Sequence, residues 1–250
     1  MITIFCFSST GNSLYAAKVL AGKTCGRVVS MNNAALTCED DVIGFVFPVY
    51  FWGLPRMVEH FATTLKITNK DAYVFAVATS GGPSFGVLGA MKKLLRSHGV
   101  SLAYGARLVS VSNYLPEYEA QDSEKIRRRI DVRITKIADA VNNRRSNRVL
   151  APTFLNRRAH RAYPDASCDR HFVVASACNG CTTCEKVCPA HNIVMNAGKP
   201  EFQHRCEHCL GCVHSCPVQA LDWKQATQGK RRYRNAGVSL SDLISANSEG

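Results

Sequence analysis

The sequence predicts two domains: an α/β domain with a five-stranded parallel sheet, followed by a smaller, cysteine-rich α+β domain. The first prediction rests on short apolar segments that alternate with amphipathic segments over residues 1–143. The second rests on eight of the twelve cysteines, which form two clusters after residue 177. With 250 residues, 46% of them hydrophobic, the chain is long enough to build two cores.

Five apolar segments have the length and composition of buried strands, at residues 2–7, 27–31, 42–49, 72–79 and 102–111. A helix is expected after the turn at residues 8–13, and further helices at 53–67, 86–98 and 117–143. Strands that alternate with helices favour a doubly wound parallel sheet covered on both faces.

The expected boundaries are 1–143 for the α/β domain, 144–170 for a basic linker, 171–223 for the cysteine-rich domain and 224–250 for a tail. Periodicity fades and arginine becomes frequent in the linker. The net charge of +12 is uneven, because residues 124–161 hold 12 basic and 3 acidic side chains. This pattern is typical of a solvated helix face or of a surface that attracts an acidic partner.

Each cysteine cluster reads C-x2-C-x2-C-x3-C-P; the first copy begins at Cys178 and the second at Cys206. In such runs three cysteines hold one [4Fe–4S] cluster and the fourth holds the other. Zinc usually needs four ligands from two C-x2-C units, and disulfides are typical of secreted chains. Residues 172–223 resemble bacterial two-cluster ferredoxins. The expected sets are Cys178, Cys181, Cys184 and Cys216 for one cluster, and Cys206, Cys209, Cys212 and Cys188 for the other.

A turn rich in hydroxyl groups follows the first expected strand and opens a helix. Free backbone N–H groups and the positive end of the helix favour a phosphate there. The turn lacks the lysine of a Walker A loop, and no G-x-G-x-x-G motif follows the strand. It resembles the phosphate loop of flavodoxins, which implies FMN. Its residues are Ser8, Ser9, Thr10, Gly11, Asn12 and Ser13.

Two more loops follow the third and fourth expected strands, at the edge of the sheet where α/β folds bind ligands. Aromatic side chains in the first loop could cover a flat isoalloxazine ring, or could pack in the core. Glycines in the second could offer backbone N–H groups to the ring. The candidate residues are Pro48, Val49, Tyr50, Phe51, Trp52, Gly53, Ser80, Gly81, Gly82 and Phe85, with Asn113 and Tyr114 as neighbours after the fifth strand.

Together the two halves resemble a family of flavodoxin–ferredoxin fusion electron carriers common in anaerobic bacteria and archaea, in which Arg232-Tyr-Arg-Asn235 looks like a recurring tail element. The resemblance implies FMN, two [4Fe–4S] clusters and electron transfer to redox proteins with an acidic docking face. It favours a carrier over a substrate-specific oxidoreductase.

Two alternatives stay open: a flavoenzyme that reduces one small substrate at the flavin, and a regulatory or nucleic-acid-binding protein that uses residues 124–161. We expect no nucleic-acid partner and no membrane insertion, since no run of 18 apolar residues occurs. Residues 1–7 are too short for a signal peptide, so a cytoplasmic location is expected. We assign no role to Cys6, Cys25, Cys38 or Cys168.

Overall fold

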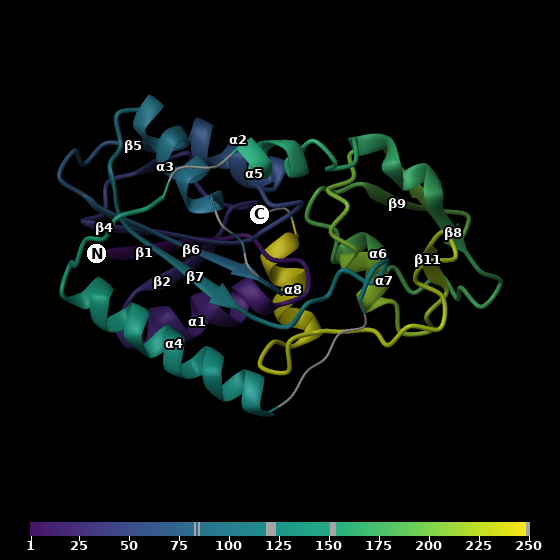
Figure 1. Cartoon of the computed structure of the whole chain (residues 1–250). Helices are drawn as coiled ribbons and strands as arrows, with labels where there is room; N and C mark the ends of the chain where they lie inside the picture. Colours follow the sequence, from purple (N-terminus) through teal and green to yellow (C-terminus); the bar gives the residue numbers. More distant parts are fainter. Residues whose placement is uncertain (83, 85, 119–123, 151–153, 249–250) are drawn as a thin grey trace. The chain divides into compact units, whose positions relative to one another are not determined.

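The computed structural model describes residues 1–82, 84, 86–118, 124–150 and 154–248. By its contacts the chain forms two compact units (Figure 1). The first consists of Met1–Phe7, Asn12–Val111 and Asp122–Tyr163. The second consists of Ser8–Gly11, Ser112–Gln121 and Pro164–Gly250.

The first unit contains a parallel sheet of five strands in the order β2-β1-β4-β6-β7. Counted along the chain, these five strands have the spatial order 2-1-3-4-5, which is the flavodoxin-like doubly wound order. The predicted fold class is therefore confirmed. The strands are β1 (Ile2–Cys6), β2 (Arg27–Ser30), β4 (Val42–Pro48), β6 (Tyr73–Ser80) and β7 (Leu102–Val109).

Helices cover both faces of this sheet. Figure 1 shows α1 and α4 on one face and α2 and α3 on the other. This placement buries both sides of the central strands, which explains the near-continuous apolar sequence of β4 and β6. The helices are α1 (Asn12–Thr24), α2 (Arg56–Thr64), α3 (Val87–Ser97), α4 (Glu124–Asn142) and α5 (Phe154–His160).

Two expected helices differ from those observed. The helix expected at 53–67 begins only after Pro55 and ends at Thr64, because Leu65 takes an extended conformation. The next residues form β5 (Lys66–Ile67), which pairs in parallel with β3 (Thr37–Cys38). The helix expected at 117–143 is described from Glu124, and residues 119–123 lie outside the described part of the chain.

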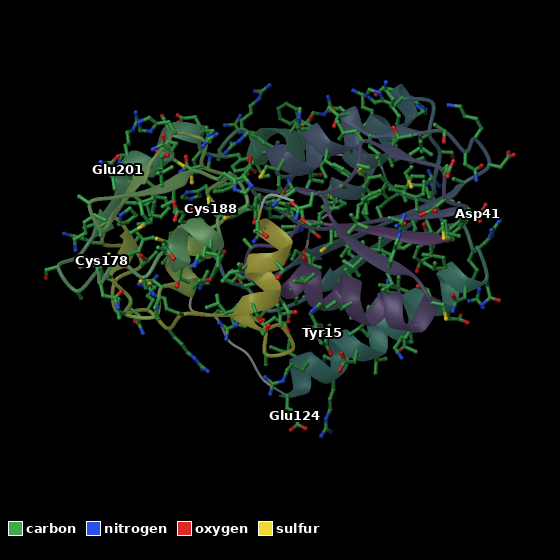
Figure 2. The ribbon with its side chains drawn as sticks, turned by 180° about the vertical axis from the view of Figure 1, so that it is seen from behind. Tyr15, Asp41, Glu124, Cys178, Cys188 and Glu201 are labelled. Atoms are coloured by element: carbon green, nitrogen blue, oxygen red, sulfur yellow. The ribbon has the colours of Figure 1, made fainter. Side chains whose placement is uncertain are left out.

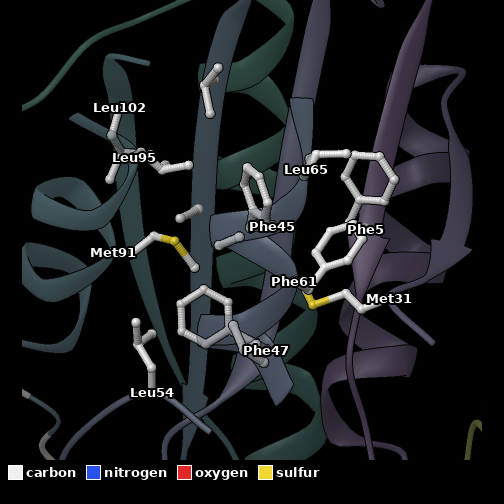
Figure 3. Close-up of a cluster of buried hydrophobic side chains, with 14 of the residues drawn as sticks. Phe5, Met31, Phe45, Phe47, Leu54, Phe61, Leu65, Met91, Leu95 and Leu102 are labelled. Carbon is white, nitrogen blue, oxygen red and sulfur yellow. The ribbon is translucent and has the colours of Figure 1, made fainter. Parts of the chain in front are cut away.

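Aromatic and aliphatic side chains fill the space between the sheet and helices α2 and α3 (Figure 3). Phe45 is fully buried, and Phe5 packs against Phe61 with 5.0 Å between ring centroids. On the opposite face, the Tyr15 hydroxyl of α1 donates a hydrogen bond to Asp131 of α4 at 2.6 Å. Figure 2 labels Tyr15 and Glu124, the first residue of α4.

The second unit has a small α+β fold, as predicted. Strand β9 pairs antiparallel with β10, and β8 pairs antiparallel with β11. The repeat in sequence recurs in structure, since α6 and α7 begin at equivalent positions of the two copies, and so do β9 and β11. The elements are η1 (Ala166–His171), β8 (Phe172–Val174), α6 (Thr183–Lys186), β9 (Ile193–Asn196), β10 (Lys199–Phe202), α7 (Gly211–Ser215), β11 (Leu221–Trp223) and α8 (Leu240–Asn247).

The expected domain boundaries stay a prediction, and the contacts divide the chain differently. Helix α5 lies within the residues expected to form a linker and belongs to the first unit, and η1 begins in that stretch and ends one residue beyond it. The loop Ser8–Gly11 belongs by its contacts to the second unit. In the described parts of the chain, no helix has the length and apolarity that crossing a bilayer requires.

Candidate cofactor sites

The second unit contains two cavities, each lined by four cysteines. The first is lined by Cys178, Cys181, Cys184 and Cys216. Its other walls are largely apolar and include Met195 and Leu221. The second cavity is lined by Cys188, Cys206, Cys209 and Cys212. The structure thus brings together the two sets that the spacing predicts, and Figure 2 labels one member of each, Cys178 and Cys188.

The exchange of the fourth cysteine between the sets follows from the two short helices. Cys184 lies in α6, and Cys188 follows the end of that helix and reaches the other cavity. Cys212 lies in α7, and Cys216 caps its C-terminus and reaches the first cavity. One turn of helix therefore carries each fourth thiol away from the three that precede it.

The backbone conformation around the thiols repeats between the two copies of the motif. Gly180 and His208 have φ values of 71° and 48°, and Thr182 and Leu210 have values of 63° and 57°. Three of these four are not glycine, so the turns hold L-residues in a conformation they seldom adopt. Such tight turns bring the N-terminal thiols of each run to a single cavity.

Backbone N–H groups point at sulfur in both halves. The N–H of Asn192 donates to Cys188 Sγ at 3.3 Å, and the N–H of Ala220 donates to Cys216 Sγ at 3.2 Å. The N–H of His208 donates to Cys206 Sγ at 3.2 Å. Hydrogen bonds of this kind stabilise negative charge on sulfur and tune the potential of an iron–sulfur cluster.

Burial disfavours the deprotonation of these thiols unless a cation is present. It raises the pKa of Cys184 to about 11 and that of Cys209 to about 12, and it also raises the pKa of Cys212. A bound metal centre offsets this cost because thiolate ligation releases the proton. The described residues hold no group of His, Cys, Asp or Glu side chains placed to bind a single metal ion. Four thiols line each cavity, and a set of four cysteines fits a [4Fe–4S] cluster.

The loop Ser8–Gly11 has features that suit a phosphate. Ser8 Oγ accepts a hydrogen bond from the Gly11 N–H at 3.2 Å, and Thr10 Oγ1 accepts one from the Asn113 side-chain amide. Because both oxygens are acceptors in these bonds, both hydroxyl hydrogens remain able to donate to an anion. Gly11 has a φ of +94°, a conformation that favours glycine, and the loop is buried. The residues present therefore fit a phosphate group.

Helix α1 begins directly after this loop. Ser13 Oγ lies 2.7 Å from Thr79 Oγ1 at the end of β6, and the Asn12 side chain donates to the carbonyl of Val111 at 3.1 Å. The last two residues of the predicted phosphate loop are therefore held by β6 and by the segment that follows β7 in the first unit.

The predicted aromatic loop forms a tight two-residue turn. Tyr50 and Gly53 exchange backbone hydrogen bonds of 3.1 and 2.8 Å, and Pro48 and Val49 lead into the turn from β4. Phe51 and Trp52 at its tip have φ values of 45° and 63°. Two non-glycine residues with positive φ indicate a strained turn, and strain of this kind concentrates at ligand sites. Trp52 is 48% exposed, so its indole is accessible.

A cluster of side chains that sequence reasoning missed packs behind this turn. Tyr163 stacks on Phe51 at 5.3 Å between centroids, and the Arg56 guanidinium lies 4.2 Å from the centre of the Tyr163 ring. The His160 ring packs against Gly53 and leaves no room for a Cβ there. Phe51 thus contributes to packing, as the alternative interpretation of these aromatics expected. His160 and Tyr163 lie in the stretch expected to be a linker, where no periodic pattern marked them.

The second loop expected to contact the flavin ring follows β6. Ser80 Oγ donates to the carbonyl of Gly82 at 2.6 Å, and Gly81 is exposed. Among the described residues, no heavy atom lies within 4 Å of a Cβ added at Gly82. Phe85, also predicted to bind the cofactor, lies outside the described residues.

Asn113 and Tyr114, expected as neighbours of the flavin, are held by histidines of the second unit. The carbonyl of Asn113 accepts a hydrogen bond from His214 Nε2 at 2.8 Å, and the Tyr114 hydroxyl lies 3.1 Å from His208 Nε2. Asn113 also supports the loop Ser8–Gly11 through Thr10.

Comparison with known proteins supports the reading of the second unit. Residues 177–232 match the model of a family described as 4Fe-4S dicluster domain. This stretch is a ferredoxin-type domain. Its match includes all eight cysteines of the two cavities. A search of curated proteins found no match to the chain.

Solved structures similar to the chain include flavodoxins. An archaeal flavodoxin is 13% identical, with 56% of this chain and 97% of that chain covered and a TM-score of 0.39. Two-electron-reduced Megasphaera elsdenii flavodoxin is 18% identical, with 54% and 99% covered and a TM-score of 0.37. The flavodoxin of Streptococcus pneumonia TIGR4 is 16% identical, with 56% and 96% covered and a TM-score of 0.41. The strand order and parallel register of the first unit show its flavodoxin-like fold.

Proposed function

We propose that the protein is an electron carrier that holds two [4Fe–4S] clusters and FMN. The observation that carries this proposal is the pair of cavities, each lined by four cysteines of a ferredoxin-type domain. When bound, FMN exchanges one or two electrons and each cluster exchanges one, so the three groups join two-electron to one-electron chemistry. The chain's own residues position these groups and set their surroundings.

In the cluster domain, the two sets of four thiols would hold one cubane each. The N–H donors of Asn192, Ala220 and His208 would stabilise charge on the ligand sulfurs. The apolar residues around the first cavity would exclude water from it. These features favour electron transfer over substrate chemistry, since none of them offers a reactive group to a small molecule.

FMN binding is supported by three loops that follow β1, β4 and β6 in a flavodoxin-like sheet. Ser8, Thr10 and the start of α1 would bind the phosphate through hydroxyl and backbone donors. Trp52 would cover the isoalloxazine ring, and the backbone at Gly82 would approach its edge.

We also propose that the partner is a redox protein with an acidic docking face. The N-terminal half of α4 presents exposed basic side chains around Val132, which is 58% exposed. A charged rim around an apolar centre is typical of transient docking surfaces. The exposed basic residues of this helix are Lys125, Arg127, Arg128, Arg129, Arg133 and Lys136.

The decisive experiment is an anaerobic absorbance spectrum with iron, sulfide and FMN quantified on the same sample. We expect about eight iron atoms per chain, as two cubanes require, together with one FMN. Eight irons without flavin, even after FMN is added, would leave a two-cluster ferredoxin and remove the flavin from the proposal. Four irons or fewer in anaerobically reconstituted protein would contradict the two-cluster assignment.

The crossed ligand assignment needs its own test. Cys184→Ser and Cys188→Ser change neighbouring residues of one motif, but the proposal assigns them to different clusters. We expect their electron paramagnetic resonance spectra to show perturbation of two different cluster signals. Perturbation of the same signal by both variants would contradict the crossed assignment.

A further inference from the structure

A buried carboxylate lies beside one of the two cysteine sets. Asp169, in η1, is 0% exposed. Its carboxylate accepts three hydrogen bonds: from the Asn192 side-chain amide at 2.9 Å, from the His204 backbone N–H at 2.9 Å and from His204 Nδ1 at 2.7 Å. The three donors satisfy the carboxylate, as burial of such a group requires. No arginine or lysine is among them.

Asn192 connects this carboxylate to two cysteines of the second cavity. Its backbone N–H donates to Cys188 Sγ at 3.3 Å, and its side-chain carbonyl accepts from the backbone N–H of Arg205. Arg205 immediately precedes Cys206, another member of the same set. One amide side chain therefore separates the Asp169 carboxylate from the segments that present both thiols. Glu207, which is also buried, lines the same cavity.

The internal repeat supplies a built-in comparison. Ala220 occupies the position of the second copy that is equivalent to Asn192 in the first, and its N–H makes the equivalent bond to Cys216 Sγ. Alanine has no amide to connect that sulfur to an acidic group. The other buried aspartate of this unit, Asp222, pairs with Arg232 at 2.7 Å, so its charge is compensated. The two cavities thus differ in the charge around them.

We infer that Asp169 gives the two clusters unequal reduction potentials. The inference rests on the proposed function, since it needs both clusters. A negative charge in a poorly screened interior disfavours the addition of an electron nearby. The cluster held by Cys188, Cys206, Cys209 and Cys212 therefore has the lower potential. An electron that enters the domain therefore resides on the cluster held by Cys178, Cys181, Cys184 and Cys216. Asp169 is a positioning residue in the sense that its charge decides which cluster holds the electron.

The test is a redox titration of the holoprotein followed by electron paramagnetic resonance. In Asp169→Asn the amide keeps the shape and loses the charge. We call the cluster held by Cys188, Cys206, Cys209 and Cys212 the Cys206 cluster. At a fixed applied potential we expect its oxidised-to-reduced ratio to fall about tenfold, which is equivalent to a rise of roughly 59 mV in its reduction potential for one electron. The signal of the other cluster should not move. Cys178→Ser and Cys206→Ser assign the two signals, because each changes a ligand of one cluster.

Glu201→Gln is the matched control, since it removes an exposed carboxylate from the same unit and solvent screens that charge (Figure 2). Unchanged potentials in Asp169→Asn with both clusters intact, or equal shifts of both clusters, would overturn the inference and leave the proposed function standing. If the wild-type protein binds no clusters, the proposed function itself fails.

A second variant keeps the inference testable if Asp169→Asn does not assemble. His204 is 64% exposed on its side chain, so His204→Ala should be tolerated. It removes one donor and leaves the carboxylate charge less compensated. The Cys206 cluster should then move to lower potential, opposite to the shift in Asp169→Asn. A rise, or no change, overturns the inference.

Discussion

The backbone N–H of Asn235 donates a hydrogen bond to the carbonyl of Thr10, with 2.9 Å between the two atoms. The Asn247 side-chain amide makes a second link, to the carbonyl of Ser8 at 3.4 Å. A Cβ added at Gly11 would come within 3.1 Å of both Asn235 and Val238. The C-terminal segment therefore shapes the loop expected to bind phosphate, although the two lie near opposite ends of the sequence.

Removal of one of these links should destabilise the second unit. In Asn247→Ala the carbonyls of Ser8 and Val187 lose a donor at a buried site, which costs about 1–3 kcal/mol. We expect a lower midpoint in anaerobic thermal unfolding. Ser245→Ala, an exposed change in the same helix, should leave the midpoint within error. Equal midpoints for both variants would show that the link contributes nothing.

The exposed indole at the strained turn should contribute to flavin binding. Trp52→Ala removes the stacking surface and should raise the dissociation constant of FMN about tenfold, which corresponds to about 1.4 kcal/mol. Titration of flavin fluorescence in cluster-loaded protein measures it. Phe154→Ala removes another exposed aromatic of the first unit and should not change the affinity. Unaltered FMN affinity in Trp52→Ala would exclude Trp52 from the site.

Two glycine substitutions should have opposite effects on stability. In Gly44→Ala the new Cβ would collide with the fully buried Phe75 ring, so we expect a loss of about 1–3 kcal/mol. In Gly22→Ala, on the exposed side of α1, no described atom lies within 4 Å and helix propensity improves by about 1 kcal/mol. Chemical denaturation of both variants measures this contrast. A destabilised Gly22→Ala variant would contradict the packing described for α1.

The Tyr15–Asp131 hydrogen bond should make the first unit less stable at alkaline pH. The bond and partial burial raise the pKa of Tyr15 to about 12. Because the folded-state pKa lies above the unfolded value of about 10, the stabilisation is complete below pH 10 and is lost as the pH rises through 12. In Tyr15→Phe we expect a loss of about 1 kcal/mol near neutral pH. Between pH 10 and 12 the free energy of unfolding should then change less in this variant than in the wild type. An equal change in both proteins would contradict this role.

The strands of the first unit could be predicted closely because each is a short apolar run between turn residues. Predicted and observed ends differ by no more than one or two positions for all five. Elements such as β3, β5 and α5 were missed because they are short and depend on partners far along the chain. The turn at Tyr50–Gly53 was predicted as a site, but its strain and the stacking of Phe51 on Tyr163 were not predictable from local sequence.

The sequence by itself predicted the two sets of four cysteines, because this motif typically places its fourth cysteine with the three of the other copy, and the same sets line the two cavities. It also determined the alternation of strands and helices, since burial on both faces of a sheet requires it. Only the tertiary structure decided how the two sets differ. Asp169, His204 and Asn192 are brought together by long-range hydrogen bonds, and no spacing or periodicity marks such contacts. The charge around a buried site depends on the residues that folding collects there.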